Sequence, residues 1–207
     1  PPTAVMAAAW RQREQLGQAA VITAAASALG FGLSLISGTL IAMLFSQSRW
    51  VRNSLFPYAI FLQTVPIVAI APLVVIWLGE GFTAVVVIAW IVSLFPIITN
   101  GTAGMLRIPT AQRELFQLCR ASRWQTLRML QLPAAIPNLV TGARIASGLS
   151  VLGAIVGEYF AGAGARRPGL GYLIFAAKDQ FALDMLFAAV LLCALLGVAM
   201  FTLVGWV

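Results

Sequence analysis

The stretch TAVVVIAWIVSLFPIITNGTAGM, residues 83–105, contains no charged side chain. It is longer than the run of about 20 apolar residues that crosses the hydrocarbon core of a bilayer as a helix. A membrane β-strand would alternate apolar and polar positions, and the segment VVVIAWIV within this stretch does not alternate. The stretch therefore predicts a transmembrane α-helix.

Four further stretches are also predominantly apolar and long enough to cross a bilayer, and they cover residues 19–45, 56–78, 136–161 and 183–207. Over the whole chain 61% of the residues are apolar and 9% are charged, whereas a soluble domain carries about 25% charged residues. We therefore expect an all-α fold, in which residues 1–207 form one polytopic transmembrane bundle with five visible spans. Both ends look trimmed, because the chain begins without Met and ends inside an apolar run.

The charged residues divide the loops between these spans into two sets. The 46–55 loop, the 106–135 loop and the start of the fourth span hold eight basic residues and one acid, Glu114. The basic residues of this first set are Arg49, Arg52, Arg107, Arg113, Arg120, Arg123, Arg128 and Arg144. The second set comprises the first 18 residues, the Gly79–Gly81 turn and the 162–182 loop. Counted with Glu158 and Asp184, which flank that loop, it has five acids and five bases. Because cytoplasmic loops collect Lys and Arg, the first set is expected to face the cytoplasm. The same rule accounts for the net charge of +7, so nucleic acid is not an expected partner.

The sequence lacks the residues that several kinds of enzyme and metal chemistry require. The sequence contains no His, which removes the commonest general base and metal ligand. The single lysine, Lys178, precedes Asp179 and cannot belong to a nucleotide-binding GxxxxGK[ST] loop. We therefore expect no catalytic residue, no metal site and no cofactor bound by this chain. The isolated Cys119 and Cys193 are expected to be packing residues.

The 106–135 loop is the least membrane-like part of the chain. Residues 112–130 contain no Gly or Pro and are rich in helix formers, which predicts one or two short amphipathic helices. In a helix starting at Gln112, Glu114 would lie in the first turn. Such a helix either rests on lipid headgroups, held by Trp124 and the arginines, or docks on another protein.

This loop resembles the signature of ABC importer permeases: Glu-Ala-Ala, three residues, Gly, nine residues, an aliphatic residue, one residue, then Leu-Pro. Glu114 takes the Glu place, and Leu130 and Leu132–Pro133 take the aliphatic and Leu-Pro places. The Ala-Ala places hold Leu115 and Phe116, and the Gly place holds Arg120, which departs from the pattern. Other blocks that resemble the family are ASRWQTLRMLQLPAAIP from residue 121, LQTVPIVAIAPLVVIWLGEG from residue 62, IVGEYFAG from residue 155 and GLGYLI from residue 169. The branch that the chain most resembles imports nitrate, sulfonates, taurine, bicarbonate or pyrimidine-type precursors.

The resemblance implies a type I ABC importer permease in the bacterial cytoplasmic membrane, not an enzyme. Such a chain forms the pathway for a small solute that a soluble or lipid-anchored binding protein delivers. ATP and Mg²⁺ bind to separate ATPase subunits, and a second permease copy and membrane lipid are the further partners. The family usually has one more span before the segment that opens this chain. The alternative is an ion-gradient-driven secondary transporter, which would show internal repeats and an intramembrane ion site.

By the same resemblance, the loop helix docks into a groove on the ATPase and transmits the closure of that subunit to the bundle. The residues expected to take part in this coupling are Glu114, Leu115, Phe116, Leu118, Arg120, Ala121, Ser122, Arg123, Trp124, Leu132 and Pro133.

Polar residues and glycines inside the spans leave alternatives open. Gln63, Thr64, Asn100 and Glu158 are candidates for lining a translocation pathway, or equally for hydrogen bonds between helices. Gly153 and Gly157 form a GxxxG pair, which serves packing within the chain or a subunit interface. Pro57, Pro66, Pro72 and Pro96 indicate either simple kinks or a non-uniform helix that lines a pathway.

Overall fold

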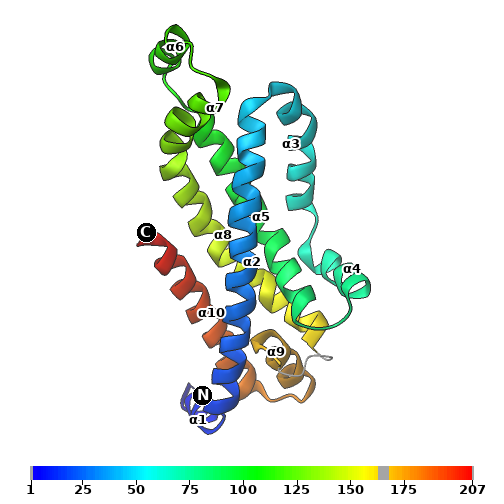
Figure 1. Ribbon diagram of the computed structural model, residues 1–207. Coiled ribbons are helices and arrows are strands. Elements are labelled where there is room, and N and C mark those ends of the chain that lie inside the picture. Colours follow the sequence, from blue (N-terminus) through cyan, green and yellow to red (C-terminus); the bar gives the residue numbers. More distant parts are fainter. Residues whose placement is uncertain (1, 163–167, 207) are drawn as a thin grey trace.

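The computed structural model describes residues 2–162 and 168–206 and forms an elongated helical bundle (Figure 1). Among these residues, four helices are long and apolar enough to cross a membrane: Arg13–Gln47, Phe82–Leu106, Arg123–Ala161 and Leu183–Gly205. They correspond to the first, third, fourth and fifth expected spans. The bundle is thus the expected polytopic all-α fold.

The helices follow one another along the chain as short and long elements. The order is α1 (Pro2–Arg11), α2 (Arg13–Gln47), α3 (Arg49–Thr64), α4 (Ile67–Leu78), α5 (Phe82–Leu106), α6 (Thr110–Leu118), α7 (Arg123–Thr126), a π-helical turn (Leu127–Gln131), α8 (Leu132–Ala161), α9 (Leu170–Asp179) and α10 (Leu183–Gly205). The N-terminus, α1 and α9 lie at one end of the bundle, and α6 and α7 lie at the other (Figure 1).

The expected span over residues 56–78 is instead two helices, α3 and α4, separated at Val65 and Pro66. Both residues are extended, with ψ angles of 124° and 125°. A proline disfavours helical geometry in the residue before it and has no N–H to continue the ladder, so the helix stops there. Pro57 and Pro72 lie inside α3 and α4 without ending them. The break at Pro66 therefore makes this segment non-uniform, and a pathway-lining role for it stays a prediction.

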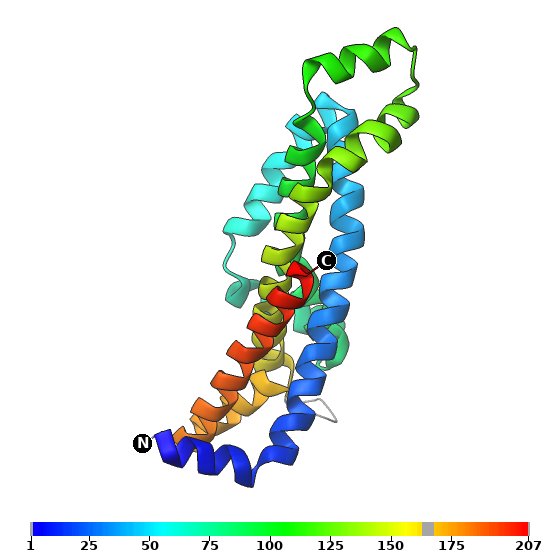
Figure 2. The same cartoon turned by 90° about the vertical axis from the view of Figure 1, so that its left-hand side faces the viewer.

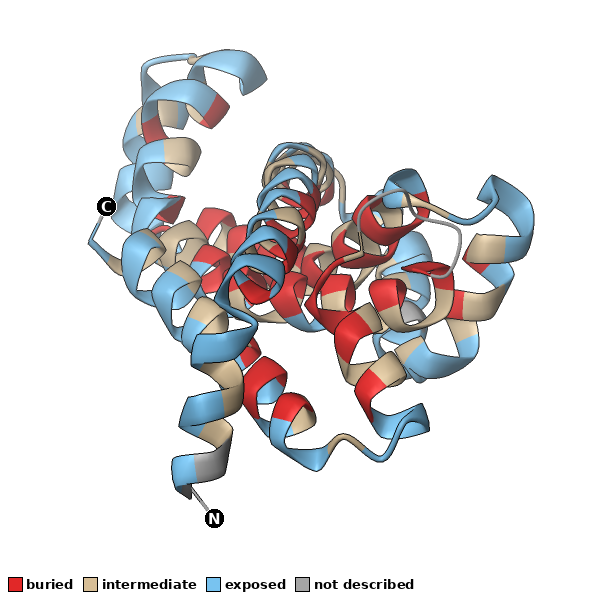
Figure 3. Cartoon of the chain, turned by 90° about the horizontal axis from the view of Figure 1, so that it is seen from below, coloured by how far each residue is buried: buried red, intermediate tan, exposed pale blue. Residues whose placement is uncertain are grey.

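Helix α5 is the centre of the bundle and packs along both α2 and α8 (Figures 1 and 2). Buried residues gather where these three helices meet, whereas the outer helices carry exposed ones (Figure 3). On α2 the exposed apolar side chains recur every three or four residues: Leu29, Leu33, Ile36, Leu40 and Leu44. An apolar stripe that no other helix covers is what a lipid-facing surface requires.

Glycines allow the close approach of α8 to α5. A Cβ on Gly153 would lie 2.8 Å from the Ala89 Cα, and one on Gly157 would lie 3.0 Å from the Val85 Cα. The GxxxG pair therefore serves packing within the chain, and the subunit-interface alternative does not hold for these two residues. Hydrogen bonds add to this packing, since Ser93 Oγ donates to Ser34 Oγ at 3.0 Å across the α2–α5 contact.

Candidate functional site

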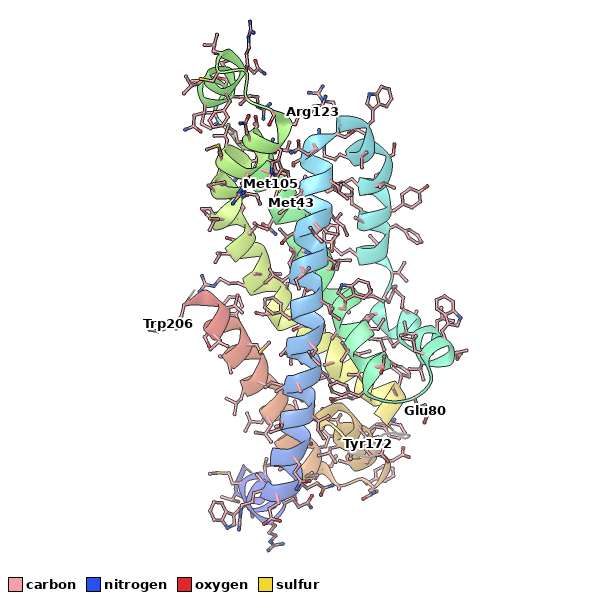
Figure 4. All side chains as sticks on the ribbon, viewed as in Figure 1. Met43, Glu80, Met105, Arg123, Tyr172 and Trp206 are labelled. Carbon is pink, nitrogen blue, oxygen red and sulfur yellow. The ribbon has the colours of Figure 1, made fainter. Side chains whose placement is uncertain are left out.

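The loop between α5 and α8 folds into two helices at the arginine-rich end of the bundle. Helix α6 begins at Thr110 directly after Pro109, and α7 begins at Arg123. In Figure 2, α6 projects beyond the ends of the long helices. The Gly79–Gly81 turn lies towards the opposite end, near the labelled Glu80 in Figure 4. The expected short helices are confirmed. Because α6 starts before Gln112, Glu114 lies in its second turn, not in the first.

Arg120 ends α6 in the conformation that a glycine would adopt. Its φ angle is 49°, the left-handed region. The Arg120 N–H donates to the Gln117 carbonyl at 2.9 Å, and the Ala121 N–H donates to the Phe116 carbonyl at 2.9 Å. This pair of bonds is a Schellman cap, in which glycine usually holds the left-handed position. The departure from the family pattern at Arg120 therefore keeps the turn and adds strain to it.

Arg120→Gly is accordingly expected to stabilise the cap by about 1 kcal/mol, because a side chain in left-handed geometry costs about that much. Hydrogen exchange of the α6 amides measures this directly, and about 1 kcal/mol corresponds to roughly fivefold slower exchange. Glu114→Gly, in the interior of the same helix, is the matched control and is expected to speed exchange. Equal effects of the two glycines would contradict the assigned cap.

Ser122 starts the next helix with a capping box. Its hydroxyl accepts from the Gln125 N–H at 3.2 Å, and its own N–H donates to the Gln125 side-chain oxygen at 2.8 Å. Leu127 then enters a buried cluster with Ala42 of α2, Met105 of α5 and Ala135 of α8. Met43, Met105 and Arg123 all lie at this end of the bundle in Figure 4. The loop is therefore packed against three helices of the bundle.

The chain passes from the loop into the fourth span without a break. The Leu132 N–H bonds to the Leu127 carbonyl, five residues back, which widens one turn into a π-helix. Pro133 has no N–H and its ring would clash with the carbonyl four residues before it, so the wider turn accommodates it. The helix of the fourth span thus begins at Arg123, whereas the sequence places its start at residue 136. As a consequence Arg144 lies well inside the helix instead of near its start, with its guanidinium 5.3 Å from the Phe201 ring centroid.

The apolar residues of α6 divide between two faces. Leu115 is 57% exposed and Leu118 is 81% exposed, and they lie three residues apart on one face. Phe116 lies on another face, where it lines a cavity between the loop and the bundle together with Ala121 and Arg123. Trp124 on α7 is 66% exposed. Leu115 and Leu118 therefore form an exposed apolar face of α6, and Phe116 belongs to its inner side.

The four candidate pathway residues do not come together. Gln63 and Thr64 lie at the break between α3 and α4, and Gln63 lines a cavity of about 430 Å³ there. Its other described lining residues are almost all apolar and include Trp90, Phe95 and Leu149. Asn100 instead donates to the Pro96 carbonyl at 2.8 Å within α5. Of the four candidates, Gln63 is the one among the described lining residues of this cavity.

Glu158 is buried and holds the start of α9. One of its carboxylate oxygens, Oε2, accepts from the Gly171 N–H at 2.8 Å and from the Thr23 hydroxyl at 2.9 Å. The Thr23 hydroxyl oxygen also accepts from the Leu170 N–H at 2.9 Å. These are the first two N–H groups of α9, which have no partner within their own helix. The contacts of Glu158 thus join α2, α8 and α9, and its role in a pathway stays a prediction.

Comparison with known proteins places this arrangement in a family. Residues 30–207 match the family described as binding-protein-dependent transport system inner membrane component. The chain belongs to that family. The chain resembles a solved chain of the MetNI methionine ABC transporter in inward facing conformations, with a TM-score of 0.74. That likeness covers 94% of this chain and 96% of the other at 20% identity, and it supports the type I importer permease fold.

Relatives within the family are named as permeases. The chain is 36% identical to the riboflavin transport system permease protein RibX of Chloroflexus aurantiacus, over 76% of this chain and 57% of that protein. It is 31% identical to a probable ABC transporter permease protein of Haemophilus influenzae, over 99% of this chain and 82% of that protein. It is 33% identical to the formylaminopyrimidine transport permease protein ThiX of Halalkalibacterium halodurans, over 85% and 69%. The chain of this inner membrane component therefore spans little more than half the length of the RibX protein.

Proposed function

We propose that this chain is the membrane-spanning permease subunit of an ABC importer. It forms part of the pathway for a small solute that a binding protein delivers on the side of α1 and α9. A separate ATPase subunit binds ATP and Mg²⁺ and docks on the exposed face of α6. Two copies of the permease and two ATPase subunits complete the transporter.

The observation that carries this proposal is the way in which the α6–α7 loop is built. Its apolar side chains Leu115 and Leu118 are exposed at the arginine-rich end. The π-helical turn that follows α7 is packed against α2, α5 and α8 through Leu127. A force on α6 would pass along the chain through α7 and this turn to the three long helices, which is the kind of path that coupling to an ATPase requires. Apolar anchors with arginines around them also suit a groove with an acidic rim.

The second permease copy and the lipid are assigned to surfaces that the chain leaves uncovered. Gly153 and Gly157 pack against α5, so we do not assign to them the contact between the two copies. Gly148 of α8 has no atom within 4 Å of an added Cβ, which leaves its face of that helix free for a neighbouring helix. The apolar stripe of α2 suits lipid.

The solute belongs to the range for which relatives are named, which includes riboflavin, formylaminopyrimidine, nitrate, aliphatic sulfonates and bicarbonate. We expect the binding protein to do much of the selecting.

The test is uptake into vesicles that contain the full-length permease, its ATPase and its binding protein. Uptake of one of these solutes is expected to require ATP on the side of α6. It should persist when ionophores collapse the proton and sodium gradients. Uptake that follows an ion gradient in the absence of ATP would overturn the proposal in favour of a secondary transporter.

A further inference from the structure

A pocket lined by arginines lies beneath the α6–α7 loop. Its volume is about 430 Å³, and we call it the arginine pocket. Its lining residues come from the end of α2, the start of α3, and the α5–α8 connection. They are Ser46, Gln47, Arg49, Arg52, Leu106, Arg113, Phe116, Gln117, Ala121, Arg123, Thr126 and Gln131.

The chemistry of this lining suits an anion. Four guanidinium groups supply only hydrogen-bond donors, and the side-chain amides of Gln47, Gln117 and Gln131 can add more. None of the described lining residues is acidic, and Glu114 is the only acid in either loop at this end. Four like charges around one cavity repel one another unless an anion offsets them. Arginine is the side chain best suited to binding phosphate with two parallel hydrogen bonds.

The walls of the pocket are tied to each other. The Gln47 side-chain amide donates to the Gln131 side-chain oxygen at 2.5 Å, which connects the end of α2 to the π-helical turn. The Arg52 guanidinium donates to the Phe45 carbonyl at 3.4 Å. These bonds leave the remaining guanidinium N–H groups of Arg52 available to a ligand, because each guanidinium has five donors.

An apolar groove adjoins the arginine pocket. The groove has a volume of about 650 Å³ and is lined by Leu40, Met43, Leu44, Gln47, Arg123, Trp124 and Leu127. Gln47 and Arg123 line both the groove and the pocket, so the two spaces share a boundary. Along α2 the groove extends from residue 40 to residue 47, which is about 10 Å of helix. Leu44 is 61% exposed and Trp124 is 66% exposed.

We propose that the arginine pocket and the apolar groove together bind one acidic phospholipid of the cytoplasmic leaflet. The phosphate lies in the pocket, and an acyl chain lies in the groove along α2. Basic pockets at the cytoplasmic ends of membrane helices suit anionic headgroups, and tryptophan prefers the level of the headgroups. A free phosphate would use the pocket and leave the groove empty. Because the lipid contacts α2, α3 and the α6–α7 loop, its binding would hold that loop against the bundle.

Native mass spectrometry of the full-length protein in detergent, titrated with phosphatidylglycerol, measures this binding. The variant Arg49→Gln with Arg113→Gln is expected to bind about 30-fold more weakly, at about fivefold for each arginine removed. The matched control, Arg107→Gln with Arg128→Gln, removes two exposed charges from the same end outside both cavities and is expected to change the affinity by less than about threefold. Leu44→Gln is expected to weaken phosphatidylglycerol binding and to leave the weak binding of inorganic phosphate unchanged.

Four outcomes would overturn the proposal. Equal losses in the pocket and control variants would show a general surface-charge effect. Phosphatidylcholine that binds as tightly as phosphatidylglycerol would show that the arginines do not select the charge. Inorganic phosphate that binds as tightly as the lipid would indicate a free-anion site. Loss of the lipid when the ATPase subunit binds would assign the pocket to that protein interface. None of these outcomes depends on the uptake assay, so this proposal and the proposed function can fail separately.

Discussion

Leu118→Asp is expected to abolish solute uptake while leaving the permease folded and inserted. Leu118 is 81% exposed at the last residue of α6, so the chain itself gains little from its side chain. In the proposed transporter Leu118 lies in the ATPase groove, where a buried carboxylate without a partner would cost several kcal/mol. Such a cost lowers the affinity for the ATPase by about 100-fold or more. The measurement is co-purification of the ATPase together with ATP-driven uptake.

Two companion variants separate this effect from damage to α6. An aspartate at the end of a helix opposes its dipole by about 0.3–1 kcal/mol, whereas a lysine there is favourable. Leu118→Lys should therefore keep α6 intact and still lose the apolar contact. Thr110→Asp adds the same charge at the first residue of α6, where a carboxylate is favourable, and is expected to remain active. Full activity in both Leu118→Asp and Leu118→Lys would show that this face of α6 does not contact the ATPase.

Gly153→Ala is expected to destabilise the bundle, whereas Gly148→Ala in the same helix is not. The added methyl on Gly153 would lie 2.8 Å from the Ala89 Cα and 3.2 Å from the Ile88 carbonyl oxygen, so α5 and α8 would have to separate. Overpacking of this kind costs about 1–3 kcal/mol. The added methyl on Gly148 meets no atom within 4 Å, and alanine is the better helix former.

Thermal unfolding of the purified protein in detergent distinguishes these two variants. The melting temperature of Gly153→Ala should fall by about 2–4 °C for each kcal/mol lost, and that of Gly148→Ala should not fall. If Gly148→Ala instead lowers uptake or dimer formation at unchanged chain stability, its face of α8 contacts the second copy. Equal losses of thermal stability in both variants would contradict the assigned α5–α8 packing.

The long apolar helices were predictable because their composition alone specifies them. The expected 83–105 span is α5 to within one residue at each end, since Gly81 and Arg107 bound its apolar run. The 19–45 span lies inside α2, which starts earlier because the polar residues after Arg13 continue the helix. The two loop helices followed from the absence of Gly and Pro over residues 112–130.

Features that depend on contacts between distant residues could not be predicted in the same way. Pro57, Pro66 and Pro72 look alike in the sequence, yet the helix is interrupted only at Pro66 among the described residues. The arginine pocket brings together residues from two loops more than 50 positions apart. Glu158 meets Thr23 across 135 positions. The glycines of the GLGYLI segment belong to the same site, because Gly169 and Gly171 have no room for a Cβ beside Glu158.

Cross-linking from Cys119 tests most directly the claim that α6 binds an ATPase on the cytoplasmic side. Cys119 is exposed at the end of α6, and Cys193 is buried, so a maleimide-linked photocrosslinker labels the first selectively. In the full-length transporter we expect a cross-link to the ATPase subunit that Cys119→Ser abolishes. A cross-link to the solute-binding protein, or labelling of Cys119 by an impermeant maleimide from outside intact cells, would contradict it.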